Sequence, residues 1–143
     1  MLHRFLLISL ALSAITSSAA AAEPLTVAQV EKVTRLSGLS AQPSKNDKAA
    51  TDFITRKDEL VITFKVTTAT AFNLSRSHPW LVDQVGLPGL GDEAFTSKVG
   101  RYICFKKGSM GACMTRAAAL PNKPALVTEA QLLQLARVAL ENL

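Results

Sequence analysis

The side chains that most often carry chemistry are scarce in this sequence. Its 143 residues include two cysteines, two histidines, one tryptophan and one tyrosine. A zinc site needs about four ligands, mostly nitrogen or sulfur, and beyond the two cysteines only one histidine, His78, follows residue 22. So few aromatic rings also leave little surface on which the bases of single-stranded nucleic acid could stack. We therefore expect no metal, no other cofactor and no nucleic-acid partner.

Motifs typical of enzymes are missing as well. Residues 86–95, GLPGLGDEAF, contain three glycines but match neither the G-x-G-x-x-G fingerprint nor the G-K-[ST] ending of a P-loop. The adjacent Asp92 and Glu93 would point to opposite sides of a strand, which does not suit catalysis by paired carboxylates. No segment resembles the G-x-S-x-G elbow of serine hydrolases. The sequence therefore argues against an enzyme.

The N-terminus has the pattern of a secretory signal peptide. His3 and Arg4 precede an apolar run, and small residues follow it up to an A-x-A site that ends at Ala22. The apolar run is shorter than the about 20 residues that span a bilayer. We predict that residues 1–22 are removed and that residues 23–143 form one domain without a transmembrane segment. The expected location is periplasmic or secreted, where disulfides can form.

Two helices are indicated by matching start signals. Thr26 with Gln29, and Thr128 with Gln131, form capping boxes whose side chains satisfy free backbone N–H groups. Apolar residues recur at helical spacing after each box, and Gly38 gives the first helix a stop. We expect both helices to pack on the same face of a sheet.

The middle of the chain is typical of antiparallel strands. Residues 50–57 and 59–66 predict a hairpin that turns at Asp58, and a further strand is expected from about Glu93. The polar segment 42–49, QPSKNDKA, is predicted to be a surface loop. The predicted fold class is α+β: a mostly antiparallel sheet of four to five strands with N- and C-terminal helices packed on one face.

Residues 70–85 are ambiguous between helix and strand. A short helix there would place Ala71, Leu74 and His78 on one side and would end ahead of Pro79. His78 and Trp80 also form the one polar and aromatic cluster of the sequence, which makes them candidate ligand contacts.

Both cysteines lie in residues 101–115, RYICFKKGSMGACMT. If Gly108 and Ser109 form a two-residue turn, antiparallel pairing places Cys104 opposite Cys113, where Cα atoms approach to about 4.5 Å, within reach of a disulfide. A redox pair would more often be a C-x-x-C at a helix start, so we predict a structural disulfide. The register puts the sulfurs on the more solvent-facing side, and the other side is the predicted core, with these residues buried: Ile62, Phe64, Ile103, Phe105 and Met114.

Three segments resemble a family of small exported bacterial proteins of unknown function, many of them actinobacterial lipoproteins. The segments are GLGDEAF, the KKGSMGACM hairpin and the closing LLQLARVALENL, and the resemblance covers mainly residues 89–143. It implies an antiparallel sheet with packed helices, similar to the fold of the photosystem accessory protein PsbP, and a non-enzymatic envelope role. This chain has no cysteine for lipidation, so membrane tethering does not carry over, and the family supplies no catalytic residues.

The leading functional prediction is a soluble, exported, non-enzymatic binding or accessory protein. Its partner would be an envelope protein, an envelope polymer or a small ligand, and the formal charge of +5, about +4 without the signal peptide, is mildly basic. One alternative is a secreted inhibitor or toxin-neutralising protein whose hairpin 105–112 presents Lys106, Lys107 and Met110 to a target. A second alternative is a small hydrolase that uses His78.

Overall fold

The computed structural model describes residues 23–77 and 83–143, and they form an α+β fold. The predicted signal peptide, His78 and Trp80 lie outside the described residues. None of the described helices is long and apolar enough to cross a membrane. Helices and strands follow one another in the order α1 (Val27–Thr34), β1 (Ser40–Pro43), β2 (Thr51–Ile54), β3 (Leu60–Thr68), α2 (Ala69–Arg76), β4 (Gln84–Gly86), β5 (Glu93–Ser97), β6 (Tyr102–Lys107), β7 (Met110–Arg116) and α3 (Glu129–Glu141).

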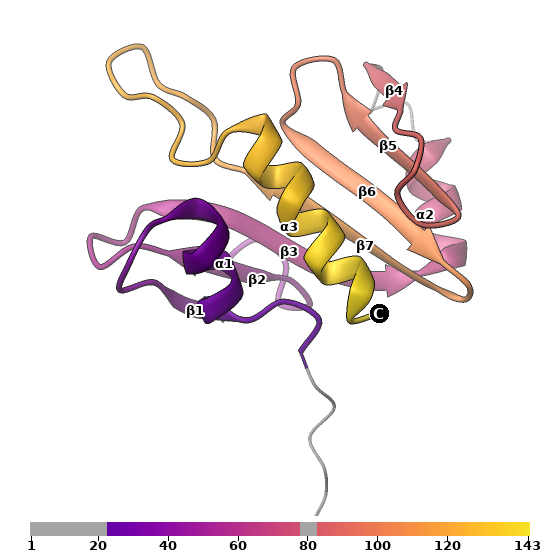
Figure 1. Ribbon diagram of the computed structural model, residues 1–143, viewed down its shortest axis with the longest axis horizontal. Coiled ribbons are helices and arrows are strands. Elements are labelled where there is room, and N and C mark those ends of the chain that lie inside the picture. The colour runs from indigo at the N-terminus through magenta and orange to yellow at the C-terminus, as the bar shows by residue number, and fades with distance from the viewer. Residues whose placement is uncertain (1–22, 78–82) are drawn as a thin grey trace, which may run out of the picture.

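The strands form one seven-stranded sheet in the order β1-β2-β3-β7-β6-β5-β4 (Figure 1). All of the pairings between these neighbours are antiparallel. The prediction of four to five strands is too low because it misses the short strands at the two edges. Strand β1 includes Gln42 and Pro43, from the segment predicted as a loop, and β4 lies at the end of the ambiguous segment. Pro43 is tolerated because an edge strand has one side on which no ladder hydrogen bond is needed.

Both predicted hairpins are confirmed. The β2–β3 turn contains Asp58 with φ of 59°, and Gly108 in the β6–β7 turn has φ of 58°. In the β6–β7 hairpin, the turn leaves Lys107 opposite Met110, so the ladder continues outward in the predicted register. This hairpin lies in the middle of the sheet, between β3 and β5.

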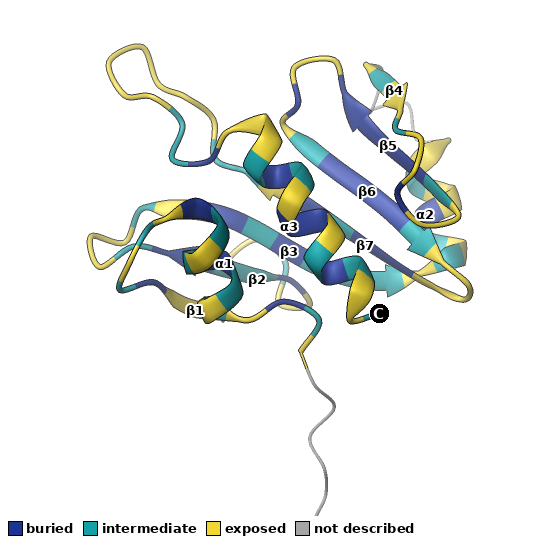
Figure 2. Cartoon of the chain, viewed as in Figure 1, coloured by how far each residue is buried: buried dark blue, intermediate teal, exposed yellow. Residues whose placement is uncertain are grey.

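Helices α1 and α3 cover one face of the sheet, which we call the core face (Figures 1 and 2). The buried stripe of α3, which includes Leu132 and Leu135, joins one apolar cluster with the strands beneath it. The five predicted core residues all belong to this cluster and are at most 5% exposed. Gln131 ties the two helices together, because its Nε2 donates to the carbonyl of Thr34 at 3.2 Å.

Both capping boxes form as predicted, but α1 ends earlier than its sequence suggests. Arg35 takes the left-handed conformation, with φ of 60°, and its N–H donates to the carbonyl of Glu31. The Glu31 carboxylate then accepts the N–H of Leu39 at 2.9 Å, which stabilises the chain as it leaves the helix. Gly38, the predicted stop, also has positive φ but lies in the following turn.

Helix α2 lies on the opposite face of the sheet. The first part of the segment that was ambiguous between helix and strand is thus helical, and the helix is capped by Thr68, whose side chain accepts the N–H of Ala71 at 3.1 Å. Phe72 marks the buried side of this helix and is fully buried, whereas Leu74 is 65% exposed. The two terminal helices therefore share one face, as predicted, and α2 packs on the other.

Candidate functional site

The two cysteines define the second face of the sheet, which we call the disulfide face. Cys104 on β6 lies opposite Cys113 on β7, and the two form a disulfide with a Cα–Cα distance of 4.1 Å. Alternation along the strands places Lys106 and Gly111 on the same face and turns Phe105 and Ala112 toward the core face. The predicted pairing is thus confirmed, and the described part of the chain has no free cysteine.

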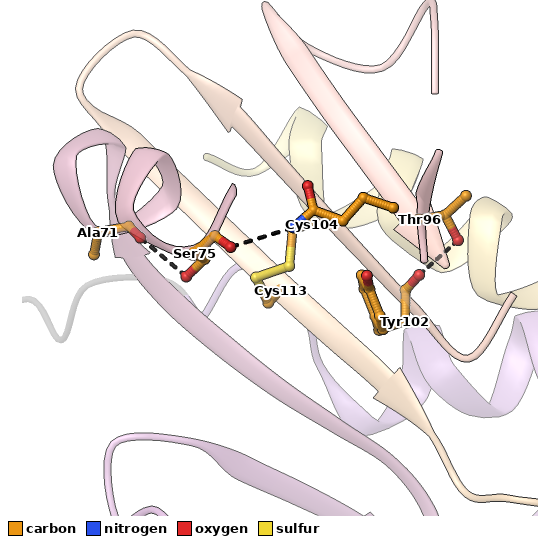
Figure 3. Close-up of a disulfide and its surroundings, with 7 residues drawn as sticks. Ala71, Ser75, Thr96, Tyr102, Cys104 and Cys113 are labelled. Atoms are coloured by element: carbon orange, nitrogen blue, oxygen red, sulfur yellow. Dashed lines mark hydrogen bonds between the residues drawn. A yellow bond between two sulfur atoms is a disulfide. The ribbon is translucent and has the colours of Figure 1, made fainter. Parts of the chain in front are cut away.

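Helix α2 covers the end of the disulfide face near the β6–β7 turn, where it packs against β3, β6 and β7. Phe72 packs against Phe95 with a ring separation of 5.2 Å, and Cys104 belongs to the same buried cluster. The prediction of solvent-facing sulfurs is therefore wrong for Cys104, which is 4% exposed. Cys113 is half-buried at the margin of this cluster. Figure 3 shows the sulfur–sulfur bond beside Ser75 of α2.

Beyond α2, the disulfide face carries polar side chains on adjacent strands. The pairing register aligns Gln42 (β1), Asp52 (β2), Thr63 (β3) and Thr115 (β7) across the sheet, with Lys65 next to Thr63 on the same side of β3. These five residues are half-buried or exposed, and we call them the open strip. The sequence contained a signal for part of it, because Thr63 and Lys65 alternate with the buried Ile62 and Phe64.

Internal contacts hold three of the five side chains of the open strip in place. Thr63 Oγ1 donates to Asp52 Oδ1 at 2.7 Å, and Lys65 Nζ pairs with Asp47 Oδ2 at 2.5 Å. The hydrogen bond from Lys65, helped by the N–H of Ala49, lowers the pKa of Asp47 below its usual value. The strip therefore presents charged and hydroxyl groups at fixed positions on rigid strands.

The hairpin residues suggested as an inhibitory surface do not form one patch. Lys106 points to the disulfide face, where its Nζ lies 3.0 Å from Glu93 Oε2 and 2.9 Å from Asn73 Oδ1. Lys107 points to the core face, where its Nζ donates to the carbonyl of Leu140 at 3.3 Å. Met110 is 38% exposed opposite Lys107. The two lysines thus hold neighbouring elements on opposite sides of the sheet.

The GLGDEAF segment braces this hairpin from β5. Gly91 has φ of 64°, and a Cβ atom at this position would come within 2.3 Å of the Lys106 carbonyl oxygen. The Asp92 carboxylate accepts the N–H of Gly108 at 2.7 Å. Glu93 pairs with Arg76 at 2.7 Å as well as with Lys106, and the hydrogen bond from Lys106 lowers the pKa of Glu93. These contacts give Gly91, Asp92 and Glu93 of the motif a structural role.

Two shallow hollows lie away from the open strip. One, of about 370 Å³, is formed by the turn between β4 and β5 together with Arg76 and Glu93. The other, of about 220 Å³, is mostly apolar and lies between Leu60 and the connector that leads to α3, with the ion pair of Glu59 and Lys123 at its edge. Within the described ranges, no group of three or more His, Cys, Asp or Glu residues could hold a metal ion.

Tyr102 is a feature that the sequence did not single out. Its ring lies edge-on to Phe95 at 6.0 Å, and its buried hydroxyl has no hydrogen-bond partner in the part of the chain that the structure describes. Burial raises the pKa of Tyr102, and the negative charge of Asp83 adds to this effect. Its backbone carbonyl accepts the Thr96 hydroxyl at 2.7 Å, as Figure 3 shows.

Compared with known proteins, the chain matches no family model, no curated protein and no solved structure. The resemblance to small exported bacterial proteins therefore stays a prediction, as does the likeness to PsbP.

Proposed function

We propose that this protein is an exported, non-enzymatic binding protein and that a partner protein or envelope polymer contacts it at the open strip. One observation carries the proposal: α1 and α3 cover the core face, whereas α2 covers only one end of the disulfide face. Beyond α2, four adjacent strands bring polar side chains into one row across this face, which is formed by Gln42, Asp52, Thr63 and Thr115. A sheet that buried this area within its own fold would instead carry apolar residues there.

The chemistry of the open strip suits an extended partner better than a small enclosed ligand. Neighbouring strands are about 4.8 Å apart, so the side chains of the strip repeat at that spacing across the sheet. Hydroxyl, carboxylate, amide and ammonium groups can pair with the polar groups of a peptide or a glycan. Because one ion pair and one hydrogen bond already order Lys65, Asp52 and Thr63, binding would cost these three residues little side-chain entropy.

The compartment is part of the same proposal. A disulfide is compatible with an oxidising compartment, and the signal-peptide pattern of residues 1–22 supports export. The hairpin alternative has less support, because Lys106 and Lys107 are engaged on opposite faces. The hydrolase alternative stays a prediction, since His78 lies outside the described residues.

A pair of surface substitutions tests the proposal. Thr115→Arg adds a bulky cation to the open strip at an exposed position, and Gln134→Arg adds the same side chain to the exposed side of α3. Each variant is expressed with its signal sequence, and the measurement is its retention on the isolated envelope fraction at fixed ionic strength. We expect Thr115→Arg to reduce retention at least about tenfold, as a steric clash at an interface centre does, and Gln134→Arg to bind like wild type.

Equal retention of both variants would contradict a binding role for the open strip. If only Gln134→Arg loses retention, the partner would lie on the α3 side. Thermal unfolding of both variants, measured in parallel, separates loss of binding from loss of fold.

A further inference from the structure

The disulfide lies at the boundary between the α2 cluster and the open strip, and its two sulfurs have different surroundings. Cys104 is 4% exposed, buried by Phe72 of α2 and by its neighbour Phe95 on β5, whereas Cys113 lies at the margin of this cluster and is half-buried. We propose that Cys113 is a site of thiol–disulfide exchange, attacked by the thiolate of a dithiol reductant, and that opening the bond loosens α2 while the rest of the fold persists. This inference does not depend on the proposed binding function.

Access decides which sulfur reacts. Exchange requires the thiolate to approach one sulfur of the disulfide directly, and its rate depends on which sulfur can be reached. Phe72 and Phe95 are both fully buried around Cys104 and block that approach. Attack at Cys113, with Cys104 as the leaving sulfur, is the route that the packing leaves open.

Charge favours the same sulfur. Lys65 on β3 is the register partner of Cys113 and lies on the same face, so its side chain begins about 5 Å from that of Cys113. A nearby ammonium group attracts an anionic thiolate and stabilises a cysteine thiolate once it forms. Asp47 pairs with Lys65 and reduces this effect without removing the cation.

The reaction is an ordinary thiol–disulfide exchange. The attacking thiolate forms a bond to Cys113 Sγ, and the electron pair of the protein disulfide passes to Cys104 Sγ, which leaves as a thiolate and takes a proton from water. The second thiol of the reductant then attacks the mixed disulfide and releases Cys113. The protein gains two electrons and two protons, and the dithiol is oxidised to a disulfide.

The hairpin has other interactions to hold it when the bond opens. Strand β7 pairs with β3 along its whole length as well as with β6, and Asp92 fixes the turn through the Gly108 N–H. The disulfide closes a short loop with a sequence separation of 9, and short loops give the smallest constraint on the unfolded chain. The cluster of Phe72, Phe95 and Cys104 is small and separate from the core on the other face, so α2 is the element that depends on it most.

Reduced glutathione is the probe for the site of attack. Native protein is incubated with it, quenched with acid, alkylated and mapped by peptide mass spectrometry. We expect glutathione on Cys113 and the alkyl group on Cys104, with at least about tenfold preference, because access governs attack. Glutathione mainly on Cys104, or no reaction until denaturant is added, would overturn the proposal.

A pair of lysine variants tests the electrostatic argument. Lys65→Gln should slow the reaction about two- to fivefold at low ionic strength, an effect that salt should weaken. Lys57→Gln, at the exposed β2–β3 turn, should react at the wild-type rate. Equal rates for both variants would show that Lys65 does not accelerate the exchange.

Hydrogen exchange of the oxidised and reduced proteins tests the structural consequence. We expect the amides of α2 to exchange at least about tenfold faster after reduction, while those of α1 and α3 keep their protection, since local openings can occur without global unfolding. A uniform increase throughout the chain, or no change in α2, would contradict the proposed local response.

Discussion

The two faces of the central sheet differ in what covers them. On the core face, α1 and α3 bury a continuous apolar cluster that extends from Phe53 on β2 to Ala94 on β5. On the disulfide face, Phe72, Phe95 and Cys104 form a small separate cluster under α2, and the neighbouring strands expose polar side chains. Stability therefore depends mainly on the core face, and the disulfide face is the part of the described surface where substitutions can change recognition without unfolding the domain.

The largest expected effect comes from a pair of phenylalanine substitutions that compare the two faces. Phe105 and Phe72 are both fully buried, one on each face. Phe105→Ala should lower the free energy of unfolding by about 3–5 kcal/mol. Phe72→Ala should cost less, because its cluster contains far fewer buried side chains than the core on the other face. Urea denaturation measures both free energies. If Phe72→Ala costs as much as Phe105→Ala, the two faces contribute equally to stability.

The second prediction concerns the brace between β5 and the hairpin. Gly89 and Gly91 both have positive φ, but only Gly91 approaches another backbone atom, the Lys106 carbonyl oxygen. Gly89→Ala should cost about 1–2 kcal/mol, the usual penalty for a left-handed residue with a Cβ. Gly91→Ala should cost about 3 kcal/mol because a steric clash is added to that penalty. Thermal unfolding measures both costs. Equal costs would mean that the backbone at the Lys106 carbonyl shifts without penalty to make room for the added Cβ.

A smaller effect is expected from removing the disulfide. Replacing Cys104 and Cys113 together with Ala should lower the free energy of unfolding by at most about 2.5 kcal/mol, because the bond closes a short loop. Guanidinium denaturation of the double variant against oxidised wild type measures the difference. A loss larger than that of Phe105→Ala would show that the disulfide face, and not the core face, dominates stability.

The smallest effect is a dependence of stability on acid at Glu93, which joins Arg76 of α2 to Lys106 of β6. The pKa of Glu93 in the folded state lies below its ordinary value of 4.5, chiefly through the hydrogen bond from Lys106. The stabilisation is therefore complete above pH 4.5 and is lost as pH falls through the folded pKa. Melting temperatures between about pH 6 and pH 3 should show an acid decline that Glu93→Gln makes shallower.

The matched control for Glu93 is Glu141→Gln, at the exposed end of α3. If this variant changes the acid decline as much as Glu93→Gln does, the contacts between α2 and β6 are not its source.

The sequence predicted well wherever local rules fix the structure. The capping boxes at Thr26 and Thr128 form because each depends on side chains three residues apart. The disulfide register follows from the turn at Gly108, since antiparallel pairing proceeds outward from a turn one residue at a time.

Other features could not be predicted because they depend on contacts between distant segments. The edge strands β1 and β4 carry weak local signals and exist because β2 and β5 offer free backbone groups to pair with. The burial of Cys104 depends on Phe72, which lies 32 positions earlier in the sequence. Local alternation fixed which face Cys104 is on, but not whether a helix would cover that face.

By itself the sequence determined the α+β class, the two capped terminal helices, the paired cysteines and the apolar side of the central hairpin. Each of these follows from spacing along a single segment, where sterics and hydrogen bonding leave few choices. The tertiary structure alone decided that α2 covers one end of the disulfide face and leaves the open strip uncovered. The position of α2 depends on how much apolar surface the helix can bury and on where its connections allow it to lie. Both are properties of the whole packed domain.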